Sequence, residues 1–450
     1  MAAYPTASRW TGQARRKSVR LLQKEREKGL REDMNNMPLG YFSVLPEEII
    51  YHVFSKLSST ELSRLSLVSK SLRDIVIAYN LTRQGLNRLM GSGCALRSKS
   101  KRNKVDLCQC FKNLGLLVKR STCLYPTRER LRLMETLFHE LVANFTIESS
   151  RINHCFGRFF SIFVKGWQER ECLRAYFAVI NYKNVVLKMT NVISGKPGEK
   201  ADQEMEVRSF LRGVILDQCE SLEDLGMWLH FILQPYPMVH QARLLLLIYG
   251  SLSKRKDQIN WTFMSLDDQN IASHVASAPF RDLAVAIKAL HGHSEWNTDS
   301  VISVLEEVTA CPNEWLDDNV ARLLCMCGEA IVIPVLASKA INGKMTQLSS
   351  IIVGLAVVTY LSNLNMSWLV KILREVCDIV PSEHDVVGLV DATVGYFRTV
   401  ILAMPDQGDA GRMIMFEDAV SAFTCFTREL MMTSIKPSTK AGRQHLMTEE

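Results

Sequence analysis

The chain has 450 residues, of which 47% are hydrophobic and 22% are charged. This composition is ordinary for a soluble globular protein, and the length allows two or three domains with no need for disulfide support. The twelve cysteines stand singly or as Cys-x-Cys, and the first thirty residues hold no apolar signal core, so free thiols in a reducing compartment are expected. The uncharged stretch from Met345 to Val370 has an apolar centre, 351–361, that is too short for a membrane span of roughly 20 residues. It predicts a buried helix and no membrane partner.

Residues 1–40 are polar and basic, and we expect a disordered N-terminal arm. Nine Lys and Arg against four acids occupy 1–33, and a second basic cluster occupies 97–104. Both clusters suit nuclear import or contacts to nucleic-acid phosphates, and a solvated tail and linker would carry the same charges. A mitochondrial transit peptide also fits the arm, because its first acid is Glu25; we predict the nucleus and cytoplasm. The candidate contacts are Arg15, Arg16, Lys17, Lys99, Lys101 and Arg102.

Residues 41–82 form a compact block in which three short amphipathic helices are expected. Pro46 suits a first helical turn, and the acids that follow it lie at the positive end of the helix dipole. Ser58-x-x-Glu61 is a capping box that predicts the start of a second helix, and Leu72 lies on the apolar stripe of a third. A block below about 40 residues rarely folds alone. It should therefore dock on a partner or on the rest of its own chain.

The remaining chain is predicted to be helical almost throughout. Gly91-Ser-Gly93 and the basic cluster indicate a linker over 83–106. From 107 to 433 helical stripes follow one another, as in Leu369, Ile372, Leu373 and Val376, and strand alternation is nowhere sustained. The predicted fold class is all-α, with a large helical domain at 107–433 and a disordered tail at 434–450. No strict repeat period is evident, so a bundle and an irregular helical-repeat stack both fit.

The compact block resembles the F-box motif across its whole length. The matching order is Leu45-Pro-x-Glu-Ile49, then Phe54-Ser-x-Leu57, Glu61-Leu-x-x-Leu65 and Leu67-Val-Ser-Lys70. The resemblance implies a three-helix F-box at 41–82 that binds the Skp adaptor, which links F-box proteins to a cullin scaffold and a RING subunit. Many F-boxes have an aromatic residue where this chain has Leu72, so the third helix matches less well. The implied adaptor-facing residues are Leu45, Pro46, Ile49, Phe54, Leu57, Leu62, Leu65 and Val68.

Most of residues 45–430 further resembles the F-box only protein 47 family. The segments that carry this resemblance are 116–120, 126–131, 166–172, 237–244 and 337–343. The resemblance implies a germline, meiotic and chromosome-associated setting. It also implies that the domain at 107–433 recruits a protein substrate, which no motif identifies.

The function predicted from these features is the non-catalytic substrate-recognition subunit of a Skp–cullin–F-box ubiquitin ligase, in which catalysis depends on proximity. No phosphate-binding loop, nucleophile elbow or His-Glu-x-x-His motif is present. His291-Gly-His293 and Cys108-x-Cys110 lack the further ligands of a zinc site, so no metal or cofactor is predicted. The alternative is a non-catalytic helical scaffold that binds chromatin or nucleic acid through the basic clusters, in a salt-dependent manner.

Overall fold

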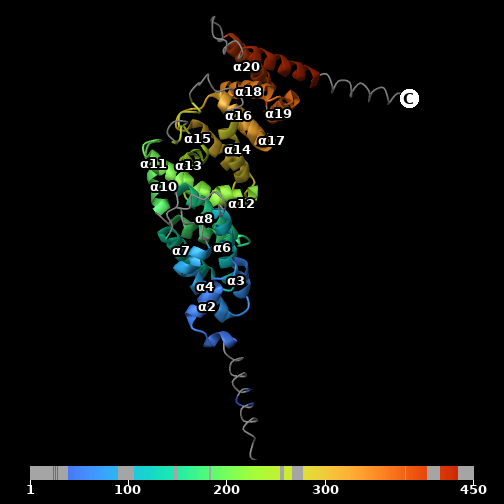
Figure 1. The fold of residues 1–450 in the computed structure, drawn as a ribbon. Helices are drawn as coiled ribbons and strands as arrows, with labels where there is room; N and C mark the ends of the chain where they lie inside the picture. The colour runs from blue at the N-terminus through green and yellow to red at the C-terminus, as the bar shows by residue number, and fades with distance from the viewer. Residues whose placement is uncertain are drawn as a thin grey trace, which may run out of the picture. The chain divides into compact units, whose positions relative to one another are not determined.

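The computed structural model forms two compact units, residues 1–147 and 148–450, which are described separately. The residues it describes are Lys24, Arg26, Lys28, 39–89, 106–144, 149–181, 184–253, 258–265, 277–380, 382–402 and 416–433. In these ranges every named element is a helix, and the β-structure is confined to one antiparallel bridge between Leu252 and Ile259 (Figure 1). The all-α prediction is confirmed. The tail 434–450, the cluster 97–104 and nearly all of the arm 1–40 lie outside the described residues.

The first unit contains six α-helices after a short 3-10 turn, among the described residues. Its second helix begins where the capping box predicts: Glu61 N donates to Ser58 Oγ at 3.2 Å, and Ser58 N donates to Glu61 Oε2 at 2.7 Å. These two bonds lower the pKa of Glu61. Ser69 Oγ similarly accepts from Leu72 N at 3.1 Å and starts the next helix. The elements are η1 (Gly40–Val44), α2 (Glu47–Phe54), α3 (Ser59–Leu65), α4 (Lys70–Leu81), α5 (Arg83–Leu89), α6 (Leu107–Ser121) and α7 (Thr127–Asn144).

The core of the first unit joins α2, α3 and α4 to α6. Its buried side chains are Ile50, Phe54, Leu62, Val76, Tyr79 and Leu117. Leu117 belongs to α6, which lies outside the predicted 41–82 block. Polar contacts support the same packing, since Arg120 Nη1 donates to Ser63 Oγ at 3.2 Å and Tyr125 Oη donates to Asp74 Oδ1 at 2.6 Å. The small helical block thus gains its core by docking on its own chain.

The boundaries of this unit differ from those expected from the sequence. The linker predicted over 83–106 begins with helix α5, and the helical domain predicted from 107 contributes α6 and α7 to the first unit. Gly85 explains the close turn, because a Cβ there would lie 2.1 Å from the carbonyl oxygen of Tyr79. Leu86 is buried beside it, and Arg88 Nη1 donates to the Phe54 carbonyl at 2.7 Å. The glycines and basic residues that follow α5 led the sequence analysis to assign this short helix to a linker.

The second unit is a succession of helices that begins at α8. Here α8 packs on a π-helical turn, η3, and the fit is close: a Cβ on Gly157 would lie 2.2 Å from the Gly213 carbonyl oxygen. A further helix spans 416–433 and packs its Phe423 and Phe426 on Phe397. The other elements are α8 (Ser149–Val164), α9 (Glu169–Asn181), α10 (Val185–Ser194), α11 (Ala201–Phe210), η3 (Leu211–Ile215), η4 (Leu216–Gln218), α12 (Leu222–Leu233), α13 (Met238–Tyr249), α14 (Ser277–His291), α15 (Thr298–Ala310), α16 (Asp317–Cys327), α17 (Glu329–Ile341), α18 (Met345–Leu361), α19 (Met366–Ile379) and α20 (Glu383–Leu402).

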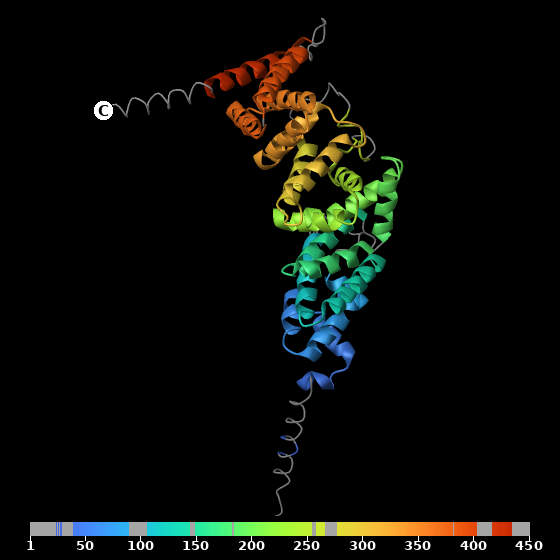
Figure 2. The same cartoon turned by 180° about the vertical axis from the view of Figure 1, so that it is seen from behind.

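From α12 onward each helix packs on the helix two places further along the chain. The even-numbered helices α12 to α20 form one row and α13, α15, α17 and α19 form another. Figures 1 and 2 show this stepwise stacking within the second unit from two sides. Such alternation defines a two-layer helical-repeat stack and decides between the two architectures that the sequence left open.

The stretch that the sequence marked as a buried helix is α18, in the middle of this stack. Its residues 348–356 are all buried between α16 and α20. The burial explains why so apolar a segment carries no charge. Within the described ranges, no helix combines the length and the apolar character needed to cross a bilayer.

Candidate functional site

Helix α2 of the first unit has two apolar faces, and only one of them is covered. Ile50 and Phe54 point into the core, while Ile49 and Val53, one residue earlier in each case, are exposed. The exposed pair is spaced i, i+4 and therefore lies on one face. Ile49 is 48% exposed, which is unusual for an isoleucine on a folded helix.

The exposed apolar side chains continue before and after α2 along the chain. Leu67 and Val68 lie in the turn between α3 and α4, and Val68 is 72% exposed. Arg73, itself buried, holds this turn by donating from Nε to the Ser66 carbonyl at 3.3 Å. We define the exposed apolar set of the first unit as Phe42, Val44, Leu45, Ile49, Val53, Leu67 and Val68.

The eight residues predicted to face the adaptor divide into three groups. Leu45, Pro46, Ile49 and Val68 are exposed, as a binding surface requires. Leu57 and Leu65 are partly buried and pack against the core. Phe54 and Leu62 are only 2% and 0% exposed, so in this structure they support the surface from inside and do not form it. For these two residues the structure corrects the expectation, because the apolar stripe in the sequence includes both faces of the helices.

Sequence reasoning missed four members of the exposed apolar set as candidate contacts: Phe42, Val44, Val53 and Leu67. Val53 could have been found, since it follows Ile49 by four residues. Phe42 and Val44 precede the motif in η1, where no amphipathic pattern marks them. Leu67 lies in a turn, where helical periodicity gives no information on exposure.

A hydrogen bond between two polar side chains joins successive turns of α2. Tyr51 Oη donates a short hydrogen bond to Glu47 Oε1 one turn earlier. Partial burial and then this hydrogen bond raise the pKa of Tyr51 to about 12, so the phenol stays protonated at neutral pH and keeps donating. The Tyr51 ring packs on the buried Tyr79 ring at 5.4 Å between centroids. The carboxylate of Glu47 is thereby held to Tyr51, which packs against the core.

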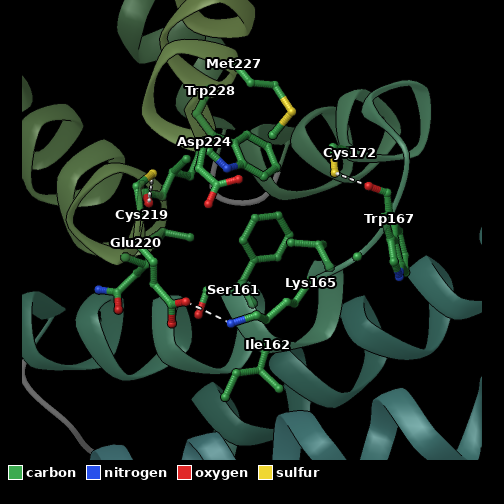
Figure 3. A pocket seen from close by; sticks show the side chains of 16 residues that line it. Ser161, Ile162, Lys165, Trp167, Cys172, Cys219, Glu220, Asp224, Met227 and Trp228 are labelled. Carbon is green, nitrogen blue, oxygen red and sulfur yellow. Dashed lines mark hydrogen bonds and ion pairs between the residues drawn. The ribbon is translucent and has the colours of Figure 1, made fainter. Parts of the chain in front are cut away.

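A second candidate is a pocket of about 170 Å³ in the second unit, between α8, α9, η4 and α12. Figure 3 shows Lys165 facing Glu220 across the pocket, with Nζ 2.8 Å from Oε2. Both side chains are mostly exposed, so this ion pair contributes little to stability. Phe160 and Trp228 form the aromatic side, with ring centroids 5.7 Å apart. The pocket is large enough for one side chain of a partner.

The two thiols that line this pocket are poor nucleophiles. Burial, and to a smaller extent nearby carboxylates, raises the pKa of Cys172 to about 11 and that of Cys219 to about 12. Cys172 Sγ donates to the Trp167 carbonyl at 3.9 Å, and Cys219 Sγ donates to the Ile215 carbonyl at 3.5 Å. Both cysteines are therefore protonated at neutral pH and structural in character.

In the part of the chain that the structure describes, the residues weighed in the sequence as metal ligands do not gather into a metal-binding group. His293 stacks on His230 at 4.7 Å between ring centroids, and Cys108 and Cys110 are half-buried on α6. Among the described residues, no group of three or more His, Cys, Asp or Glu is placed to hold a metal ion. The candidate nucleic-acid and import contacts Arg15, Arg16, Lys17, Lys99, Lys101 and Arg102 lie outside the described residues.

Comparison with known proteins identifies both parts of the chain. An F-box-like family model matches residues 42–82, and a family model described as FBXO47, ARM repeats matches residues 182–388. The mouse F-box only protein 47 is 34% identical over 375 residues, which are 81% of this chain and 82% of the mouse protein. The human F-box only protein 47 is 34% identical over 374 residues, 81% of each chain. No solved structure matches the chain. The chain belongs to the F-box only protein 47 family.

Proposed function

We propose that this protein is the substrate-recognition subunit of a Skp–cullin–F-box ubiquitin ligase and that the exposed apolar set binds the Skp adaptor. The observation that carries the proposal is the division of α2: Ile50 and Phe54 fill a core completed by α6, yet Ile49 and Val53 remain exposed. An F-box that already has its own core has no folding reason to keep large aliphatic side chains in water. Such a surface is typical of an interface.

In this proposal the chain positions a substrate and performs no chemistry. The ligase transfers ubiquitin from a separate conjugating enzyme, so the F-box subunit contributes effective concentration alone. The protonated thiols of Cys172 and Cys219 are poor nucleophiles, as expected of a chain that performs no chemistry. The helical-repeat stack of the second unit supplies the substrate surface, because such stacks present long, continuous faces to their partners.

The setting is also part of the proposal. The family resemblance implies germ cells in meiosis, and the basic clusters suit a protein that is found in both nucleus and cytoplasm. Imaging of the tagged protein in meiotic germ cells would test this. Exclusion from both nucleus and chromosomes would contradict it without affecting the adaptor proposal.

The adaptor proposal is tested by capture of purified Skp adaptor on the full chain. The variant Ile49→Glu/Val68→Glu places charges in the exposed apolar set. We expect capture to weaken at least about tenfold, because each site loses apolar burial and adds a desolvation cost of about 1 kcal/mol or more.

A matched control separates the surface from general effects of charge. Leu124 is 72% exposed, like Val68, but lies after α6 and outside the exposed apolar set. Leu124→Glu should capture adaptor as the wild type does. Equal capture by the double variant and the wild type, or no capture by the wild type, would refute the proposal.

A further inference from the structure

A cavity of about 310 Å³ opens in the second unit among α15, α16, α17 and α18. It lies where α15 and α17 end and where α16 and α18 begin, because its lining includes residues 309–310, 317, 339 and 344. Its volume is at the small end of ligand sites and suits one long side chain. The apolar part of its wall includes Leu305, Trp315, Leu324, Val335 and Ile351.

The lining contains more acidic than basic side chains. Lys339 and Lys344 both approach the same carboxylate, with each Nζ 3.9 Å from Glu306 Oε1. Asp317 Oδ2 accepts a hydrogen bond from Tyr396 Oη at 3.3 Å. Among the described residues, Glu307 and Glu314 form no ion pair, so they remain available to a cation. The charged lining consists of Glu306, Glu307, Glu314, Asp317, Lys339 and Lys344.

Lys339 shows which chemistry this cavity accepts. Its side chain is only 13% exposed, yet it lies in the wall with its ammonium near carboxylates. Burial lowers the pKa of Lys339, while Glu306, Asp317 and Glu314 raise it. The wall thus already holds one largely buried lysine with its ammonium beside an acid, which is the arrangement that a basic side chain from a partner would adopt.

The local charge opposes the charge of the chain. Four carboxylates and two ammonium groups leave the lining with two excess negative charges, whereas the whole chain carries a net charge of +7. The net positive charge of the whole protein repels a basic peptide. Any preference for basic side chains must therefore come from a local site such as this cavity.

We infer that this cavity receives a lysine or arginine side chain from the protein segment that the second unit recruits. The aliphatic part of the incoming side chain packs beside Trp315 and Ile351, and its cation reaches Glu307 and Glu314. The role of that segment as a ubiquitylation substrate rests on the proposed function. The preference of the cavity for a basic side chain does not depend on the adaptor.

The test is a peptide array probed with the labelled full chain. The peptides have random neutral flanks and a fixed central Lys, Arg, Met or Glu. We expect Lys and Arg peptides to bind about fivefold or more above Met and Glu peptides. Glu307→Gln/Glu314→Gln should remove this preference while keeping the shape of both side chains. Lys339→Met, which removes the competing ammonium, should increase it.

A matched control is Glu223→Gln/Glu383→Gln, which changes the net charge equally at two exposed positions that do not line the cavity. It should keep the wild-type preference. The inference is overturned if the wild type shows no preference for basic peptides or prefers Glu peptides. It is also overturned if the preference is unchanged in Glu307→Gln/Glu314→Gln or is weaker in Lys339→Met.

Adaptor capture by the same variants is measured in parallel. If the wild type captures the adaptor but shows no preference for basic peptides, only the inference about the cavity is refuted. If the wild type prefers basic peptides but does not capture the adaptor, only the adaptor proposal is refuted.

Discussion

At the scale of residues, adjacent positions in the F-box have opposite roles. Ile49 and Ile50 are both isoleucines on α2, but the first is exposed and the second is 5% exposed in the core. The sequence predicts α2 and the capping box that starts α3, and the Ser58–Glu61 bonds confirm that capping box. It could not assign the two faces, because apolar residues occur on both and helical periodicity does not reveal that α4 covers one of them.

This difference predicts opposite effects for two substitutions. Leu62→Ala should destabilise the first unit by about 2–5 kcal/mol, because it leaves a cavity at a fully buried site. Ile49→Ala should change stability by less than about 1 kcal/mol but weaken adaptor capture. Hydrogen exchange of α4 amides in the full chain reports the first effect. If Ile49→Ala speeds that exchange as much as Leu62→Ala does, the assignment of the two faces is wrong.

His230 in the second unit predicts a dependence of stability on pH. Burial lowers its pKa below the ordinary value of 6.5, and the stacked His293 lowers it further, while Glu295 and Glu169 oppose this shift. Trp296 Nε1 donates to His230 Nδ1 at 3.2 Å, which requires the neutral ring. Since the unfolded chain takes up the proton first, the contribution is fully present above about pH 6.5 and is lost as the pH falls towards the folded pKa.

The matched variant is His230→Asn, whose amide oxygen can replace Nδ1 as acceptor but does not titrate. Denaturant unfolding followed by tryptophan fluorescence at about pH 7.5 and about pH 5.5 measures the effect. The wild type should lose more stability between the two values than His230→Asn. An equal loss in both proteins would mean that the half-buried ring does not govern this pH response.

At the scale of elements, α6 packs on the F-box helices α3 and α4 and belongs to the same unit. It supplies Leu117, which has no exposed surface, to the core with Phe54 and Tyr79. The sequence suggested a break before residue 107 because glycines and basic residues precede it. Segment composition missed α5 at the start of the predicted linker, and it does not reveal on which side of a linker a helix packs.

The substitution Leu117→Ala tests this role of α6. It should speed hydrogen exchange in α3 and α4, because the site contacts their core, with a loss of about 2–5 kcal/mol. The control Leu124→Ala, at an exposed position shortly after α6, should leave exchange unchanged. Protected α3 and α4 amides in Leu117→Ala would show that the F-box core does not need α6.

At the scale of the whole molecule, the helical content was predictable and the repeat stack was not. Successive even-numbered helices start at Ser277, Asp317, Met345 and Glu383, so the intervals are 40, 28 and 38 residues. No fixed period exists for a sequence search to find. The stack is evident only from the packing of each helix on the helix two places further on. The cavity beside Glu307 and Glu314 arises from that packing, and no local motif marks it.

The central claim is that the exposed apolar set of the F-box binds the Skp adaptor. Hydrogen–deuterium exchange of the full chain with and without purified adaptor tests it most directly, since a bound surface exchanges more slowly. We predict new protection in η1, in α2 and in the turn that carries Leu67 and Val68, with no change from α12 to α20. Protection confined to the second unit, or no protection at saturating adaptor, would contradict the claim.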